Sequence, residues 1–343
     1  MKFDKLVLLS MVLCAVVLAG ELMAYGPSVH NYSADAQIEE GSFNISVSAS
    51  DAENYSAIIM DNGAHPAPTQ IYIYLDDRYN ESLRDVTDAI GLKGIDMGYA
   101  IDQMCKLLKI RGFDNIQVCD DEQLLNAMTE DMNGPMSKGL LVMSYALPES
   151  IYSGSADSLL FDWMGHGGSL YWMSSPIGMF YHGENGLVTV ENSQELFFGK
   201  DCMNMAFAGL ALSAIDAGGL TEALALKWNR VLYGLDTSGM DGAVALGFSQ
   251  DGYSSVSMVP FGNGMICVAG GIYDRYQRED MAQLIASGIT CYSQILEIRS
   301  GDVIRGTAEF SCEVPDGSDG LSAYVYLGGY YVVYGRSFVC SAV

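Results

Sequence analysis

The sequence predicts an α/β fold with a doubly wound, mostly parallel sheet and a small C-terminal antiparallel β segment. Between residues 70 and 173, short apolar runs alternate with amphipathic stretches, which is the pattern of strand–helix–strand units. Connections of this kind between parallel strands are almost always right-handed. From Gln294 onward the chain alternates apolar and polar residues without another helix pattern, which is typical of antiparallel strands.

The expected elements of the sheet domain follow from apolar runs and helical spacing. The first strand is QIYIYL at 70–75, and a helix follows because apolar residues recur at helical spacing from Met97 to Leu108, with Gly112 placed to end it. An Asn-Gly turn at 263–264 predicts a late hairpin. Further strands are expected at 116–119, 139–145 and 169–173, and further helices at 122–128, 159–164, 221–228 and around 281–285.

Six apolar residues are expected to be buried on adjacent parallel strands, under the helix that carries Ile101, Met104 and Leu108. These six are Ile71, Ile73, Leu141, Met143, Leu170 and Trp172.

The N-terminal 24 residues have the pattern of a secretory signal peptide. Two lysines precede an apolar run from Leu6 to Gly20, as in the charged and apolar regions of such signals. The run is shorter than the roughly 20 residues that a transmembrane helix needs. We therefore expect an extracellular or cell-surface protein. The alternative is an uncleaved anchor, and any membrane association is expected through this segment.

Residues 25–68 form a Ser/Asn-rich segment that we interpret as a stalk or an edge hairpin. Four Asn-x-Ser sequons, three of them in this segment, indicate N-glycosylation of an exported chain, although chance in a Ser- and Asn-rich linker explains them equally well. The sequon asparagines are Asn31, Asn44, Asn54 and Asn80.

The net charge of −25, with 42 acidic against 17 basic residues, excludes some classes of partner. A field of this sign repels nucleic acid and anionic lipid. An acidic surface is typical of adaptation to solubility or salt, and divalent cations are the alternative explanation. Partners are therefore expected among glycans and surface proteins.

The eight cysteines show no CxxC pair and no Cys/His cluster at zinc spacing. We expect no cofactor. In an oxidising compartment the preferred disulfide is Cys312 with Cys340, because both fall in the C-terminal β-rich segment. Cys105 and Cys267 lie in apolar runs and are expected to be core residues.

Residues 69–290 resemble the degenerate, ThuA-like branch of the class I glutamine amidotransferase-like superfamily. The resemblance is carried by GLLVMSYALPE, HGGSLYWMSS and VPFGNGMICVAGG with the helix DMAQLIASGI, and it implies a flavodoxin-like sheet. Residues 291–343, with VIRGTAEFSCEVPDGSDGLSAYVYLGG, resemble the first strands of a bacterial Ig-like adhesive domain. About half of such a domain is covered, which indicates truncation and a cell-surface setting.

The turn after SLYWM decides what catalysis the resemblance allows. Active members place a nucleophilic cysteine there in a G-x-C-x-G elbow, with a later histidine and glutamate. Here the turn has no cysteine and the last histidine is His182, so the resemblance implies no glutaminase activity. Ser174 or Ser175 with His182 or His166 and a carboxylate is the remaining triad, and it makes an extracellular serine hydrolase acting on a glycan or amide the alternative function.

Polar residues follow the predicted strands at the edge where parallel strands end. Ligands bind at this edge of open α/β sheets, and such groups suit a polyol or a hard cation. The alternative is that the aspartates cap helices. We therefore expect a non-catalytic binding site, with Asp76 and Asp77 solvent-reachable and facing Tyr145 and Ser174 across one cleft. The candidate ligand-binding residues are Asp76, Asp77, Asp120, Asp121, Tyr145 and Ser174.

Overall fold

A computed structural model gives the architecture of most of the chain. It describes residues 32–39, 41–49, 52–78, 96–173, 176–204, 220–224, 226, 234–248, 253–269, 275–303, 306–318, 320–328 and 333–341. The expected signal peptide, Asn31, Asn80, Ser174 and Ser175 lie outside these residues.

The central sheet has nine strands in the described part of the chain and is mixed. Its strand order is β11-β12-β14-β15-β8-β6-β4-β5, with β13 paired to β14. The parallel strands are β4 (Gln70–Tyr74), β5 (Ile116–Cys119), β6 (Lys138–Val142), β8 (Ser169–Trp172) and β15 (Gly264–Ala269). The antiparallel strands are β11 (Met203–Asn204), β12 (Gly234–Leu235), β13 (Val244–Phe248) and β14 (Ser254–Phe261).

Helices cover both faces of this sheet because its strands are apolar on both sides. One face packs against α4 (Met97–Ile110), α9 (Arg275–Ser287) and the short α8 (Leu220–Ala223). The other face packs against α5 (Asp121–Asp131), α6 (Leu159–Gly165) and α7 (Ser193–Phe198). A small sheet of β7 (Ala146–Pro148), β9 (Phe180–Gly183) and β10 (Gly186–Thr189) follows the end of β6.

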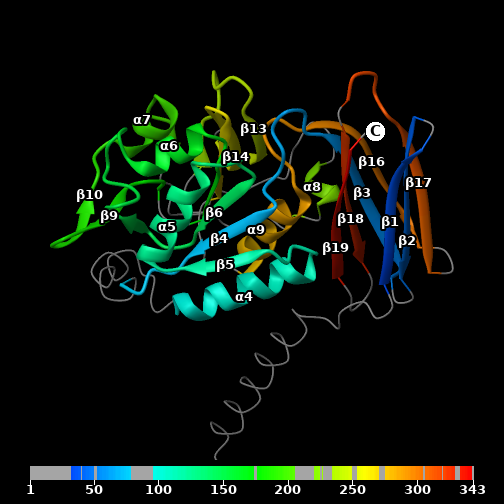
Figure 1. The fold of residues 1–343 in the computed structure, drawn as a ribbon, viewed down its shortest axis with the longest axis horizontal. Helices are drawn as coiled ribbons and strands as arrows, with labels where there is room; N and C mark the ends of the chain where they lie inside the picture. Colours follow the sequence, from blue (N-terminus) through cyan, green and yellow to red (C-terminus); the bar gives the residue numbers. More distant parts are fainter. Residues whose placement is uncertain are drawn as a thin grey trace, which may run out of the picture.

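A β-sandwich stands beside the central sheet and is built from both ends of the described chain. One sheet has the order β1-β2-β17 and the other β16-β3-β18-β19. The blue N-terminal strands therefore lie side by side with the orange and red C-terminal strands (Figure 1). The bounds are β1 Tyr32–Glu39, β2 Ser42–Ala49, β3 Asn54–Asp61, β16 Gln294–Asp302, β17 Thr307–Glu313, β18 Gly320–Gly328 and β19 Val333–Ser341.

Strand β3 is buried on both faces. Ala57 and Ile59 pack with Phe43 and Val325 inside the sandwich, whereas Ile58 and Met60, on the opposite side of the strand, join the core beneath α4 and α9. Because successive side chains of a strand point to opposite sides, β3 belongs to two cores at once. The sandwich is therefore a layer of the main body.

A polar contact joins β18 of the sandwich to the helices α4 and α9. The Tyr324 hydroxyl donates to Gln283 Oε1 on α9 at 3.1 Å, and Arg111 Nε, at the end of α4, donates to the same oxygen at 2.7 Å. These groups are buried, and buried polar groups are costly unless they are hydrogen-bonded. The contact therefore fixes the position of α4 and α9 against the sandwich.

The predicted fold class, a doubly wound, mostly parallel flavodoxin-like α/β sheet, is wrong. In the part of the chain that the structure describes, strand residues outnumber helical residues by about two to one. Four strands of the nine-stranded sheet are antiparallel, and the other described strands form a two-sheet sandwich and the small sheet of β7, β9 and β10. The C-terminal β segment is also no separate appendage, because β16, β17 and β18 pair with strands from residues 42–61.

The narrower prediction of buried, parallel neighbouring strands is confirmed. β4 pairs with β6 and β6 with β8, both in parallel, and all six predicted residues are fully buried. The helix covers only part of this set. Leu170 and Trp172 lie on the opposite face, with Trp163 of α6.

The predicted Cys312–Cys340 disulfide is absent from this structure. Cys312 is a free thiol on β17 and lies beside Glu297 of β16. Cys340 is on β19, at the other edge of the four-stranded sheet.

Among the residues described, there is no helix both long enough and apolar enough to span a bilayer.

Because β3 belongs to two cores, truncating either face should affect one shared unfolding transition. We expect Ile59→Ala, on the sandwich side, and Met60→Ala, on the helix side, each to lower the free energy of unfolding by about 2–5 kcal/mol. Chemical denaturation followed by both far-UV circular dichroism and tryptophan fluorescence measures this. Thr307→Ala, on an exposed strand position, is the control. Two separate transitions, with Ile59→Ala affecting only one of them, would contradict the shared core.

Candidate functional site

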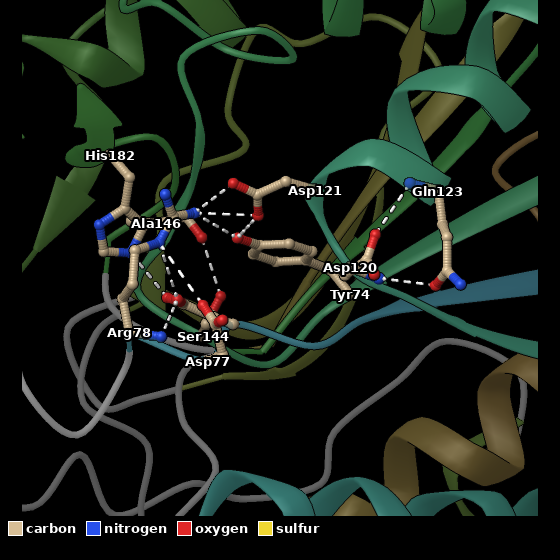
Figure 2. Close-up of polar contacts among 10 residues, drawn as sticks. Tyr74, Asp77, Arg78, Asp120, Asp121, Gln123, Ser144, Ala146 and His182 are labelled. Atoms are coloured by element: carbon tan, nitrogen blue, oxygen red, sulfur yellow. Dashed lines mark hydrogen bonds and ion pairs between the residues drawn. The ribbon is translucent and has the colours of Figure 1, made fainter. Parts of the chain in front are cut away.

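The candidate site lies where β4 and β5 end and the chain enters α5. β4 leaves the sheet after Tyr74, and two aspartates follow with opposite surroundings. The side chain of Asp76 is fully buried, whereas that of Asp77 is 87% exposed. Figure 2 shows the polar contacts around them. One of the two carboxylates is therefore part of the interior and the other is free to meet a ligand.

Asp76 forms a buried pair with His182. The Nε2 atom of His182 lies 2.8 Å from Asp76 Oδ2. The side chain of Asp76 is 0% exposed and that of His182 is 2% exposed. The backbone N–H of Arg78 donates to the other oxygen, Oδ1, at 3.0 Å. A buried carboxylate needs such partners because its desolvation is costly. Both oxygens of Asp76 are thereby occupied.

His182 reaches this place through the small sheet. It lies on β9, whose strand pairs in parallel with β7 and places His182 opposite Pro148. The carbonyl of His182 accepts a hydrogen bond from the Glu149 N–H at 2.9 Å. The β9–β10 hairpin is thus attached to the end of β4 by the Asp76–His182 contact.

Arg78 lies between three carboxylates. Its Nη2 atom is 2.7 Å and 2.9 Å from the two oxygens of Asp121, the first residue of α5. Its Nε atom is 3.7 Å from Asp76 Oδ1 and 3.8 Å from Asp77 Oδ1. Charge-assisted contacts of a guanidinium with carboxylates are among the strong hydrogen bonds of proteins. Arg78 is therefore the centre of the site.

Tyr74 completes the network as a donor. Its hydroxyl donates to Asp121 Oδ1 at 2.7 Å, and Arg78 Nη2 lies 3.0 Å from its oxygen. Burial, together with the negative charges of Asp76 and Asp121, raises the pKa of Tyr74 far above its ordinary value. The phenol consequently stays protonated and holds the Asp121 carboxylate in place.

Asp120 caps α5, as the alternative interpretation of this residue predicted. Its Oδ1 atom accepts from the Gln123 N–H at 2.9 Å, and the Gln123 side chain accepts from the Asp120 N–H at 3.1 Å, which together form a capping box. Figure 2 shows this pair apart from the Arg78 contacts. Asp120 is accounted for by helix capping, whereas Asp121 is part of the site.

The prediction of an open cleft is wrong for Asp76 and Tyr145. Asp76 is not solvent-reachable because His182 and the Arg78 backbone cover it. Tyr145 is buried in the core beneath α4, and its neighbour Ser144 donates to the Ala146 carbonyl at 2.8 Å in the interior. The exposure predicted for Asp77 is confirmed.

Two residues of the site, Arg78 and Tyr74, were absent from the predicted set. One signal was present in the sequence: Arg78 is the first basic residue after Lys5 and directly follows two aspartates. In a chain this acidic, an isolated arginine beside carboxylates indicates pairing. The part played by Tyr74 had no such signal, because a strand tyrosine in an apolar run is typical of packing.

The residues of this site do not favour a metal ion. Within the described residues, no group of three or more histidine, cysteine, aspartate or glutamate side chains could hold one. The guanidinium of Arg78 already supplies positive charge between Asp76, Asp77 and Asp121. A hard cation would have to displace it.

The remaining predicted residues lie elsewhere. His166 follows α6 at the amino end of β8, away from the carboxyl end where Asp76 and His182 meet. The sequon residues Asn44 and Asn54 are half-buried on β2 and exposed at the start of β3, respectively. Glycosylation of the four sequons stays a prediction.

The contrast between the two neighbouring aspartates gives a matched pair of variants. Asp76→Ala removes one partner of a buried pair, so we expect the free energy of unfolding to fall by about 3 kcal/mol or more. Asp77→Ala alters an exposed carboxylate, and we expect a change within about 0.5 kcal/mol. Denaturant titration of both variants measures the difference. Equal midpoints for the two would show that the Asp76–His182 contact does not stabilise the fold.

No family model and no curated protein matches this chain. Among solved structures it is similar to a β-galactosidase from the Antarctic haloarchaeon Halorubrum lacusprofundi, with 12% identity, a TM-score of 0.40 and coverage of 76% of this chain and 34% of that chain. It is also similar to a cold-adapted β-galactosidase from Rahnella sp. R3, with 14% identity, a TM-score of 0.38 and coverage of 80% and 40%. An exo-β-1,4-mannosidase from Opitutaceae bacterium strain TAV5 gives 13% identity, a TM-score of 0.35 and coverage of 63% and 33%. The chain thus spans less than half the length of these enzymes.

Proposed function

We propose that this chain is an exported, non-catalytic surface protein that binds the hydroxyl groups of a glycan at Asp77, Arg78 and Asp121. The observation that carries the proposal is the position of Arg78. Its guanidinium is fixed by Asp121 and lies beside Asp77. The Arg78 side chain is still 36% exposed and the Asp121 side chain 40%. A ligand can therefore reach donors and acceptors that are already held in place.

The chemistry of the cluster favours a neutral polyol. Neighbouring hydroxyl groups of a sugar both donate and accept, so one can donate to a carboxylate while the next accepts from the guanidinium. The planar fork of arginine suits such paired contacts. An anionic ligand is disfavoured by the two exposed carboxylates and by the net charge of −25. The position at the carboxyl end of β4 agrees with the usual place of ligands in parallel sheets.

A serine hydrolase is the second candidate, and the Asp76–His182 pair favours it. A carboxylate bonded to one ring nitrogen orients a histidine for use as a base by its other nitrogen. The nucleophile would be Ser174 or Ser175, which directly follow β8 in the sequence. The burial of both members of the pair favours a structural role for them over catalysis.

Binding at Arg78 can be tested with a conservative variant. A glycan-array screen of the purified protein identifies a ligand, and isothermal titration then compares variants. We expect Arg78→Lys to weaken binding at least about tenfold, since lysine keeps the charge but loses the paired contacts. Asp102→Asn, in the exposed Lys106–Asp102 pair on α4, is the control and should bind as the wild type. Unchanged affinity in Arg78→Lys would remove the proposed site.

The hydrolase alternative predicts a different pattern. We expect no turnover of acetylated sugars or of chromogenic esters and amides by the wild-type protein. Turnover that disappears in the Ser174→Ala/Ser175→Ala double variant and in His182→Gln, but persists in Arg78→Lys, would instead establish the hydrolase.

A further inference from the structure

A cavity lies at the amino end of the parallel strands of the central sheet, where β8 and β15 begin. Its volume is about 420 Å³, and residues 64–66, 136, 166, 167, 169, 263–265, 290 and 292 line it. The lining contains two histidines, His65 and His166, and no aspartate or glutamate. The chain has 42 acidic residues and four histidines, so half of its histidines and none of its carboxylates line this cavity.

The hydrogen bonds of both histidines fix the same tautomer. His65 Nδ1 is 3.2 Å from the Asn263 carbonyl oxygen, and His166 Nδ1 is 2.9 Å from the Asp162 carbonyl oxygen. A carbonyl oxygen can only accept, so each Nδ1 carries the proton. In the neutral imidazole, each Nε2 is then a bare lone pair. This is the arrangement that metal-ligating histidines adopt, with the second nitrogen bonded to a backbone carbonyl.

Both histidines line this cavity, and the contacts of His65 hold its ring in place. The Asn263 carbonyl oxygen that accepts from His65 also lies 3.7 Å from the position of a Cβ on Gly167, the residue after His166. His65 stacks on Tyr292, with ring centroids 3.8 Å apart and planes 12° from parallel. The Tyr292 hydroxyl in turn donates to the Gly264 carbonyl at 2.7 Å. The His65 ring is therefore positioned by three contacts before any ligand arrives.

The lining of the cavity also includes a thioether side chain. Met136 lines the same cavity, and its Cβ and Cγ atoms lie 3.2 Å and 3.3 Å from the position of a Cβ on Gly167. Glycine at this position, with φ of +118°, leaves room for that close approach. Imidazole nitrogens suit Zn²⁺ and Cu²⁺, thioethers suit copper, and hard cations require the carboxylates that this cavity lacks.

We propose that this cavity binds a transition-metal ion of the Zn²⁺ and Cu²⁺ class through the Nε2 atoms of His65 and His166, with Met136 as a neighbouring soft donor. Water or a ligand group fills the remaining positions. The site is independent of the glycan site at Arg78, because it lies at the other end of the parallel strands and shares no residue with it.

The experiment is a titration of the purified protein with Cu²⁺ and Zn²⁺ in the presence of millimolar Mg²⁺, which occupies the acidic surface. Cu²⁺ should give an electron paramagnetic resonance spectrum with nitrogen superhyperfine splitting. His166→Gln, on an exposed residue, should lower the affinity at least about tenfold, as should His65→Gln, because disturbing metal-site residues costs about 10–100-fold. Asp102→Asn should bind as the wild type.

Three results would overturn the proposal: no binding under these conditions, equal affinity in the wild type and the His65→Gln/His166→Gln double variant, or a copper spectrum without nitrogen splitting. Because His166 is exposed, its variant tests the site even if His65→Gln unfolds; circular dichroism verifies that each variant is folded. Weaker Cu⁺ binding in Met136→Leu, with Zn²⁺ binding retained, would support the thioether as the soft donor. Equal Cu⁺ binding in that variant would remove Met136 from the site.

Discussion

The burial of β3 on both faces is the constraint on which the rest of the structure depends. One face closes the sandwich core with Ile59, and the other adds Ile58 and Met60 to the core that contains α4, α8 and α9. Without the sheet that β3 forms with its neighbours, the helices on that face of the central sheet would expose their apolar outer surfaces to water, at a cost of roughly 25 cal/mol for each Å². The sandwich therefore completes the core of the α/β part as well as its own.

At the carboxyl end of β4, a few shared partners stabilise several carboxylates. Asp76 is buried and shares its two oxygens between His182 and the Arg78 backbone. Arg78 then serves Asp121 and lies beside Asp77. One arginine thus stabilises three neighbouring carboxylates, and a ligand can reach two of them, Asp77 and Asp121. In a chain with a net charge of −25, such a gathering would otherwise be opposed by mutual repulsion.

Local patterns in the sequence predicted those parts of the fold that local forces determine. The strands at β4, β5, β6 and β8 follow their apolar runs, and the hairpin between β14 and β15 follows the turn where Gly262 adopts φ of +58°. Strands β11 and β12 of the central sheet escaped prediction because each is two residues long. The capping of α5 by Asp120 was foreseen because a cap depends only on its immediate neighbours. The burial of Asp76 was not predicted, because its partner His182 lies 106 residues away in the sequence. No residue near Asp76 in the sequence indicates this pairing.

The position of β3 between β16 and β18 also affects when β3 can fold during synthesis of the chain. Ile58 pairs with Ile298 and Tyr324, so the ribosome makes about 240 further residues before either neighbour exists. Contacts between such distant parts of a chain form slowly, because a long loop must close before they contribute. Until then, a strand with two apolar faces and two unpaired edges is open to pairing with other chains. The segment that carries β16 and β18, residues 294–328, therefore decides whether β3 pairs within its own chain or aggregates.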